Sequence, residues 1–202
     1  MEALNLMNIS KIFKKSKRVL KHLLERVHNR KSKLTDSQKL ALVAMRNCNK
    51  LVIETERQSG CTVVLLMHAI WHAFSNRDRT VVILSPDSVF LSQTLSAYLD
   101  TLFGDMNIVR YISRHEMRFW NGSRILIRPQ NENSVRGMAV DLLIVEQYHR
   151  FNSKKAQSFM SSILPCMSAT RGTIVIETED ELDIPGFTKV IMQSLPKEQP
   201  FC

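Results

Sequence analysis

A short polar segment, ETERQSGCT at residues 54–62, has the residue types of a phosphate-binding loop. It lies between two apolar runs, 51–53 and 63–67, which predict a strand before it and a helix after it. Backbone N–H groups at the start of a helix attract phosphate oxygens, and Gly60 allows them to come close. Thr62 places a hydroxyl where Mg²⁺ would be bound. The segment therefore predicts a nucleotide phosphate site.

Cys61 occupies the position at which such a loop has lysine. A thiol is short and mostly neutral at pH 7, so it supplies neither the reach nor the positive charge. Glu54 and Glu56 bring two carboxylates to a segment that would have to bind a polyanion. Two interpretations stay open: a weakened nucleotide site, and a strand-to-helix turn that keeps the shape of such a loop without binding nucleotide tightly.

The elements around this loop predict one α/β domain. The chain has 202 residues, 44% of them hydrophobic, which is enough for one core. Apolar runs without two-fold alternation predict strands buried on both faces of a mainly parallel sheet, at residues 51–55, 81–85, 108–112, 141–146 and 173–178. Helical spacing predicts helices at 34–45, capped by Thr35 or Asp36, and at 62–75, 88–103 and 153–164.

One β-hairpin is predicted within EMRFWNGSRILIRP, because Asn121 and Gly122 supply the two positive-φ residues of a tight turn. DIPGF at 183–187 predicts a turn near the end of the chain, followed by loosely structured residues. The expected organisation is an arm over residues 1–33, an α/β domain over 34–195 and a tail over 196–202.

The positive charge is concentrated in the arm. Residues 1–33 hold ten Lys or Arg against two Glu, which accounts for +8 of the net charge of +9. Apolar residues recur there at helical spacing, which predicts a basic amphipathic helical arm. It contacts nucleic acid phosphates, packs its apolar side on the domain, or does both. The candidate phosphate contacts are Lys11, Lys14, Lys15, Lys17, Arg18 and Lys21.

Cysteine and histidine spacing gives no sign of a metal site. The four cysteines, at 48, 61, 166 and 202, form no CxxC pair and have no zinc spacing, which favours reduced thiols. His68 and His72 lie one helical turn apart without a third ligand, and we expect them to be packing residues. No apolar run approaches the length of a membrane span, and no signal-peptide core is present, so we expect a soluble intracellular protein.

The order of these motifs resembles the ATPase domain of the large terminase subunit, the motor that packages DNA into tailed-phage and herpesvirus capsids. A helix bearing a glutamine precedes the first strand and RQSGCT, and VVILSP, the Asn-Gly hairpin and SVRG follow. DLLIVEQYHRF and GTIVIETE complete the series, so the resemblance covers residues 35–179. It implies a P-loop NTPase core of the ASCE type, a mainly parallel sheet flanked by helices. Strands 51–55 and 141–146 would then lie side by side or nearly so.

The resemblance also implies roles for single residues. Arg57 matches the arginine finger of the family, and Gln38 matches the glutamine that reads adenine. Glu146 keeps a carboxylate for Mg²⁺, whereas Gln147 replaces the glutamate that activates water and cannot accept a proton at neutral pH. The nucleotide-binding residues would be Gln38, Arg57, Gln58, Ser59, Gly60, Cys61 and Thr62, with Thr62 and Glu146 as the Mg²⁺ ligands.

Three more positions match phosphate-sensing or coupling residues of the family: Arg136, Gly137 and Thr178. The coupling motif of the family has consecutive Thr or Ser followed by Pro. Here Glu177 and Glu179 flank Thr178 and no proline follows until 185, so the sequence departs from that pattern.

The function implied is a terminase-like module of viral DNA packaging with impaired hydrolysis, and with ATP and Mg²⁺ bound weakly or not at all. DNA, portal and capsid proteins would be its partners, an oligomer its working form, and the host cytoplasm or the virion its location. No nuclease domain is expected after the last strand. Two alternatives remain: a non-enzymatic nucleic-acid- or protein-binding factor, and an active ATPase whose lysine comes from Lys50 or a neighbouring subunit.

Removal of residues 1–33 tests the arm. If its basic residues contact phosphates, the full chain should bind DNA with an affinity that falls steeply with salt, by roughly 0.9 in log K per decade of salt for each phosphate contacted. The shortened chain should lose most of this binding and its salt dependence, as measured by fluorescence anisotropy. Equal DNA binding by the two chains would show that the arm does not bind DNA.

Overall fold

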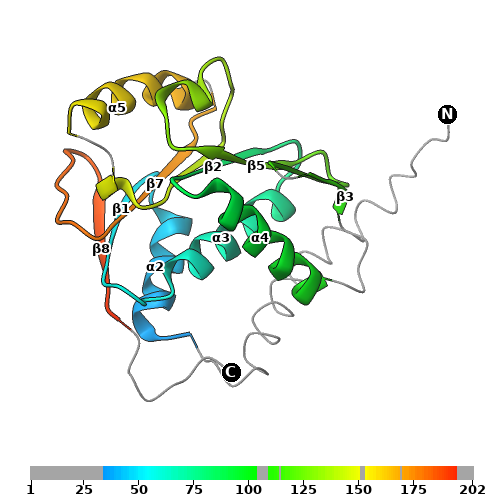
Figure 1. The fold of residues 1–202 in the computed structure, drawn as a ribbon, viewed down its shortest axis with the longest axis horizontal. Helices are drawn as coiled ribbons and strands as arrows, with labels where there is room; N and C mark the ends of the chain where they lie inside the picture. The colour runs from blue at the N-terminus through cyan, green and yellow to red at the C-terminus, as the bar shows by residue number, and fades with distance from the viewer. Residues whose placement is uncertain (1–33, 104–108, 114, 151–152, 169, 195–202) are drawn as a thin grey trace, which may run out of the picture.

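Eight strands form one sheet in the computed structural model, which describes residues 34–103, 109–113, 115–150, 153–168 and 170–194 (Figure 1). The predicted arm and the predicted tail lie outside the described residues. The strand order is β3-β4-β5-β2-β6-β7-β1-β8. The bounds are β1 Lys50–Thr55, β2 Thr80–Ser85, β3 Val109–Ile112, β4 Glu116–Phe119, β5 Arg124–Pro129, β6 Leu142–Val145, β7 Thr173–Thr178 and β8 Thr188–Met192.

The sheet is mainly parallel, as the sequence predicts. β5, β2, β6, β7, β1 and β8 pair in parallel, and β4 runs antiparallel to both of its neighbours. β1 and β6 are separated by a single strand, β7, so the expectation that they lie nearly side by side is confirmed. The loops that follow β1, β6 and β7 therefore meet at one edge of the sheet.

Helices cover both faces of the sheet, with α2 (Asp36–Asn47), α3 (Cys61–Ser75) and α4 (Ser88–Phe103) on one face and α5 (Ser153–Ser168) on the other (Figure 1). Each face has its own core. Leu66 and Ile70 of α3 pack against sheet residues on the first face, and Phe159 and Ile163 of α5 do so on the second. Because both faces are covered, the central strands have continuous apolar sequences. The predicted α/β class, a mainly parallel sheet flanked by helices, is confirmed.

α2 begins with a capping box. Thr35 accepts a hydrogen bond from the backbone N–H of Gln38, and the Gln38 side chain accepts one from the N–H of Thr35. Of the two predicted caps, Thr35 is therefore the one used.

α5 is longer than the sequence predicts. The sequence predicts its end at residue 164, and a proline inside a helix removes a backbone hydrogen bond. The helix continues through Pro165 to Ser168. Phe159, Ile163 and Met167 lie four residues apart and are all buried, so their packing on the sheet holds the last turn in place.

The hairpin of β4 and β5 is confirmed, but its turn differs from the prediction. Among these residues only Gly122 has a positive φ, at 86°, and Asn121 does not. The N–H of Gly122 bonds to the carbonyl of Phe119, and the N–H of Phe119 bonds to the carbonyl of Ser123. This is a three-residue loop, in which a turn is followed by a left-handed glycine. The Asn121 side chain donates to three carbonyl groups at the end of α3, which favours this geometry.

β8 was missed by the sequence prediction. Residues 188–192 pair in parallel with β1, and only Val190 and Met192 are buried. An edge strand with two buried positions has too short an apolar pattern to stand out, and the Pro-Gly turn before it suggested that regular structure had ended. Within the described residues, no helix has both the length and the apolarity to cross a membrane.

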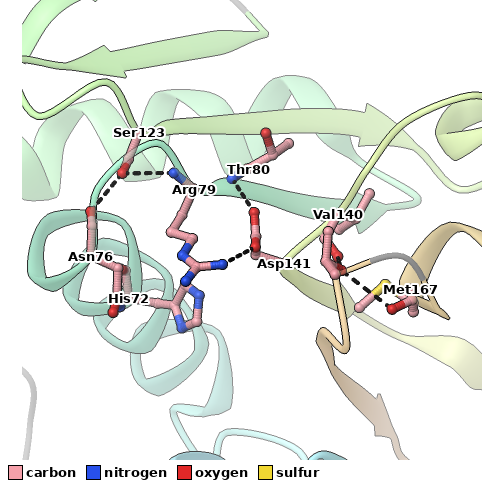
Figure 2. A network of polar contacts seen from close by, with 9 residues as sticks. His72, Asn76, Arg79, Thr80, Ser123, Val140, Asp141 and Met167 are labelled. Carbon is pink, nitrogen blue, oxygen red and sulfur yellow. Dashed lines mark hydrogen bonds and ion pairs between the residues drawn. The ribbon is translucent and has the colours of Figure 1, made fainter.

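A polar network joins the elements at the edge opposite the phosphate-binding segment (Figure 2). Asp141, just before β6, accepts from the guanidinium of Arg79 at 2.6 Å and from the N–H of Thr80 at 2.8 Å. Buried Ser123 accepts from the N–H of Arg79 at 3.1 Å and donates to the carbonyl of Asn76 at 2.7 Å. The end of α3, the start of β2 and the hairpin are thus held together.

Replacement of Ser123 by alanine tests this junction. It leaves one N–H and one carbonyl without this hydroxyl, so the free energy of unfolding should fall by about 1–3 kcal/mol in urea titrations. Ser161→Ala is the matched control, because its exposed hydroxyl bonds only to a carbonyl of its own helix. That variant should stay within about 0.5 kcal/mol of the wild type. Equal effects of the two changes would contradict the role given to Ser123.

Candidate nucleotide site

The phosphate-binding segment connects β1 to α3 as a tight loop. Gly60 is the residue before α3 and has the left-handed angles φ 71° and ψ 22°, with no side-chain cap on the helix. Gln58 also has a positive φ, at 61°, and Ser59 is buried. The uncapped N–H groups at the start of α3 are the feature by which helices bind anions. The local backbone therefore matches the shape that the sequence predicts.

A hydrogen bond links this loop to the end of β6. The Thr62 hydroxyl donates to Oε1 of Glu146 at 2.8 Å, across the width of the intervening strand β7. Glu146 is buried, and its N–H bonds to the carbonyl of Leu84 in β2. The two residues predicted to bind Mg²⁺ are thus brought together.

Cys61 lies at the first position of α3 with its side chain almost fully buried. Burial raises the pKa of its thiol well above the ordinary value, and the carboxylates of Glu177 and Glu146 raise it further. The thiol is therefore neutral over the physiological pH range. The position that would need a cation to hold phosphate thus has no charge of its own and two acidic neighbours.

Glu177 is a member of this site that sequence reasoning did not assign. It belongs to β7 and is buried, with Oε1 accepting from the Thr55 hydroxyl at 2.7 Å and Oε2 from the N–H of Gln147 at 2.6 Å. Burial raises the pKa of its carboxyl, and nearby Glu146 adds to the rise, against the hydrogen bonds that lower it. The sequence signal that could have identified Glu177 is a single acid within the otherwise apolar strand TIVIET. The strands on either side of it, β1 and β6, end at the same edge of the sheet.

Gln147 is held by its neighbours. It has a positive φ of 53°, and its side-chain oxygen accepts from Arg150 at 3.1 Å. Gln130, a second residue that sequence reasoning missed, donates to the carbonyls of Glu146 and Gln147 at 2.8 and 3.3 Å. The end of β6 is therefore fixed by the first residue after β5 as well as by β7.

Comparisons with known proteins give structural likeness only. No protein-family model matches, and no curated protein matches. The large terminase ATPase domain of Thermus phage P74-26 is 15% identical with a TM-score of 0.56, covering 70% of this chain and 65% of that one. The large terminase of another thermophilic bacteriophage, in complex with ADP, is 8% identical with a TM-score of 0.60, covering 80% and 45%.

The chain has the fold of the large terminase ATPase domain.

A DEAD box protein from the hyperthermophile Methanococcus jannaschii has a TM-score of 0.60 at 13% identity, covering 85% of this chain and 53% of that one. A similar fold therefore occurs outside the terminases, in a DEAD box protein. The likeness establishes the fold and not the activity. In each of these three comparisons the chain spans less than two thirds of the length of the other protein.

Arg57, the predicted arginine finger, and Gln38, the predicted adenine-reading residue, already have partners in this structure. Arg57 is exposed and pairs with Glu179 at 3.2 Å. Buried Gln38 accepts from the N–H of Thr35 and donates to the carbonyl of Ser59 at 2.9 Å. Gln38 thus connects α2 to the loop. An adenine base would have to compete with its hydrogen bonds to Thr35 and Ser59.

The other predicted positions lie at different distances from the loop. Thr178 is buried on β7, and its register partner on β1 is Glu54. Arg136 and Gly137 lie in the connection between β5 and β6, both exposed, and no described contact joins them to the loop. Lys50, the alternative source of a lysine, stands at the start of β1, about 17 Å from its end at 3.3 Å per residue. It lies at the wrong edge to replace the missing charge.

The carboxylates of Glu54 and Glu56 are engaged elsewhere. Glu54 pairs with Lys189 of β8 at 2.8 Å, and Glu56 accepts from the N–H of Ser194 at 3.0 Å. These contacts lower the pKa of both carboxyls. The acids that face Cys61 are instead Glu146 and Glu177.

His68 and His72 are packing residues, as the sequence suggests. His68 is buried beside Trp71, and burial lowers its pKa to about 3, so the ring stays neutral. Across the part of the chain that the structure describes, no group of three or more His, Cys, Asp or Glu could hold a metal ion.

The residues present fit the two parts of a Mg²⁺–nucleotide complex unequally. The Thr62 hydroxyl and the Glu146 carboxylate are oxygen ligands of the kind Mg²⁺ prefers. The phosphate part lacks a cation at Cys61 and adds the buried acid Glu177 beside it. The two oxygen groups predicted for the metal part are therefore present, whereas a cation for the phosphate part is not.

Replacement of Glu177 by glutamine tests the acidity of this site. Because the folded-state pKa is raised above the ordinary 4.5, the wild type should lose stability as pH rises through that pKa. Glutamine removes this loss and keeps an acceptor for Gln147. The free energy of unfolding of the variant, relative to the wild type, should therefore rise as the pH rises above the ordinary pKa of 4.5, as measured in urea titrations.

Glu179→Gln is the control for this measurement, since Glu179 forms an exposed pair and should change stability by less than about 1 kcal/mol. A difference between Glu177→Gln and the wild type that is flat or falls with pH would show that Glu177 is not an acid of raised pKa.

Proposed function

We propose that this chain is a terminase-like P-loop module of viral DNA packaging in which ATP hydrolysis is impaired. The observation that carries the proposal is the Thr62–Glu146 hydrogen bond beside the buried, uncharged Cys61. It keeps the loop and the acidic strand end in the relation that a phosphate-metal site needs, while the charge for the phosphates is missing. The large terminase of a thermophilic bacteriophage has been solved with ADP and with ATP-gamma-S, which supports nucleotide as the ligand to test.

Two changes in the site act against hydrolysis. A neutral thiol replaces a cation that would stabilise negative charge on the phosphates, and loss of one such group commonly costs about 10²–10³ in rate. Gln147 cannot take a proton from water, and its side chain is bonded to Arg150. The two losses need not multiply, because both groups serve one transition state.

DNA, portal and capsid proteins are the partners this proposal implies, and the host cytoplasm is the place where it would act. Arg57 and Gln38 would take part in nucleotide contact only after leaving Glu179 and Ser59.

A binding factor without ATPase activity is the second candidate function. The observation that favours it is that two polar groups of the loop already have partners in neighbouring elements: Thr62 bonds to Glu146, and the carbonyl of Ser59 accepts from Gln38. A loop closed in this way is stable without any ligand. In that case the fold would serve to present surfaces to nucleic acid or protein.

The double variant Cys61→Lys with Gln147→Glu tests the proposal. The new ammonium lies beside Glu146 and Glu177 and at the start of α3, so it would neutralise the acids and reach a phosphate. A charge-assisted hydrogen bond contributes about 1.5–3 kcal/mol, so Mg²⁺–ATP should bind about 10- to 100-fold more tightly than to wild type. Binding is followed with a fluorescent ATP analogue, and turnover by phosphate release.

Cys48→Lys is the control, because it adds the same charge at the end of α2, outside the loop, where the cysteine is half-buried. It should bind ATP as the wild type does. Brisk hydrolysis by the wild type would contradict the proposal of impaired chemistry. No response from the double variant would favour the binding factor instead.

A further inference from the structure

The end of the sheet formed by β3, β4 and β5 carries arginine and aromatic side chains on the face opposite α4. The register pairs Tyr111 with Arg118 and Arg118 with Arg124, so these three side chains form one row across the strands. The alternate residues Met117 and Ile125 belong to the core on the other face. We call the following residues the β3–β5 surface: Arg110, Tyr111, Arg118, Trp120, Arg124 and Arg128.

The rings on this surface are open to solvent. Trp120 is 59% exposed and Tyr111 is 50% exposed, values that are unusual for large aromatic residues. Each ring has a guanidinium over it: Arg110 lies 5.7 Å from the centroid of Trp120, and Arg118 lies 5.7 Å from that of Tyr111. These cation–π contacts orient the rings at little cost and leave much of their area exposed.

The charge of the surface is positive. It holds four arginines, and the neighbouring acid Glu116 accepts two hydrogen bonds from Arg118 at 2.8 and 3.2 Å. These bonds lower the pKa of Glu116 more than any other cause, with smaller contributions from Arg124 and Arg128, while burial opposes the change. One carboxylate thus faces several cations, and the net field attracts an anionic partner.

We propose that the β3–β5 surface binds single-stranded nucleic acid, with Trp120 and Tyr111 stacking on unpaired bases and the arginines contacting phosphates. Exposed flat rings interleaved with guanidinium groups are the combination that non-specific single-strand binding uses. Three strands at about 4.8 Å spacing present a row about 10 Å wide, which matches two or three bases.

A duplex fits the surface less well. The bases of a duplex are stacked on one another. Its phosphates can contact the arginines, but no base is free to stack on Trp120 or Tyr111. The basic arm of this chain carries charge of the same sign as the surface, so electrostatics favour an anionic strand over the arm as the occupant. The row of Tyr111, Arg118 and Arg124 also lies apart from the nucleotide site. The row passes through Arg124 at the start of β5, whereas Gln130, which contacts Glu146, follows the end of that strand.

Fluorescence anisotropy with labelled single-stranded (dT)12 and (rU)12, and with a duplex of the same length, tests this inference on the full chain. Measurements at about 0.3 M salt weaken the purely electrostatic binding that the arm would give to every probe. Trp120→Ala and Tyr111→Ala should each weaken binding of a single strand about 5- to 100-fold, and should change binding of the duplex by less than about 2-fold. The (dT)12 and (rU)12 probes distinguish DNA from RNA as the source of the strand.

Trp120→Phe separates stacking from folding. Phenylalanine keeps a stacking face, so single-strand affinity should stay within about 3-fold, whereas the quenching of tryptophan fluorescence by the strand should be lost. The fluorescence that remains comes from Trp71, the second of the two tryptophans. Phe90→Ala is the matched control, because Phe90 is an aromatic residue 61% exposed on α4, and this change should leave single-strand binding unaltered.

Three results would overturn the inference. One is single-strand binding by Trp120→Ala and Tyr111→Ala equal to that of wild type. A second is an equal loss for duplex and single strand, which would mean that only charge matters. The third is a loss with Phe90→Ala as large as that with Trp120→Ala, which would mean that binding is not specific to the β3–β5 surface.

Discussion

The hydrogen bond between Thr62 and Glu146 is the contact on which the site depends. It forms only because β1 and β6 end at the same edge of a parallel sheet with one strand between them. That order requires each strand to be buried on both faces, so the helices above and below the sheet are part of the same constraint. The network around Asp141 and Ser123 then fixes the opposite edge, and the strand ends cannot shift independently.

Charge decides what this geometry can do. A phosphate site needs positive potential where the γ-phosphate would lie, and here a buried thiol is flanked by Glu146 and Glu177. A buried acid without a cation is costly, which is why Glu177 accepts two hydrogen bonds and has a raised pKa. The fold is thus that of a terminase ATPase domain, while the side chains around Cys61 are acidic. The β3–β5 surface shows the opposite balance, with arginines in excess.

Much of the fold follows from the sequence, because long apolar runs and helical spacing are strong signals. The strand before Glu146, the loop around Gly60 and the Asn-Gly hairpin are all where the pattern predicts them. Edge strand β8 and the last turn of α5 escape prediction, since their formation depends on packing that local pattern does not contain. The role of Glu177 also needs coordinates, because a single acid in a strand becomes part of a site only through residues 30 or more positions away.

The most direct test of the central claim is an NMR titration of the isotope-labelled full chain with Mg²⁺–ATP, following the backbone amide signals of Gly60, Cys61 and Thr62. The account predicts that these signals move little and do not saturate at about 1 mM nucleotide, because no cation holds the phosphates against Glu146 and Glu177. Saturating shifts of these three amides at micromolar nucleotide would contradict it, and would show that the uncapped start of α3 binds phosphate without the missing lysine.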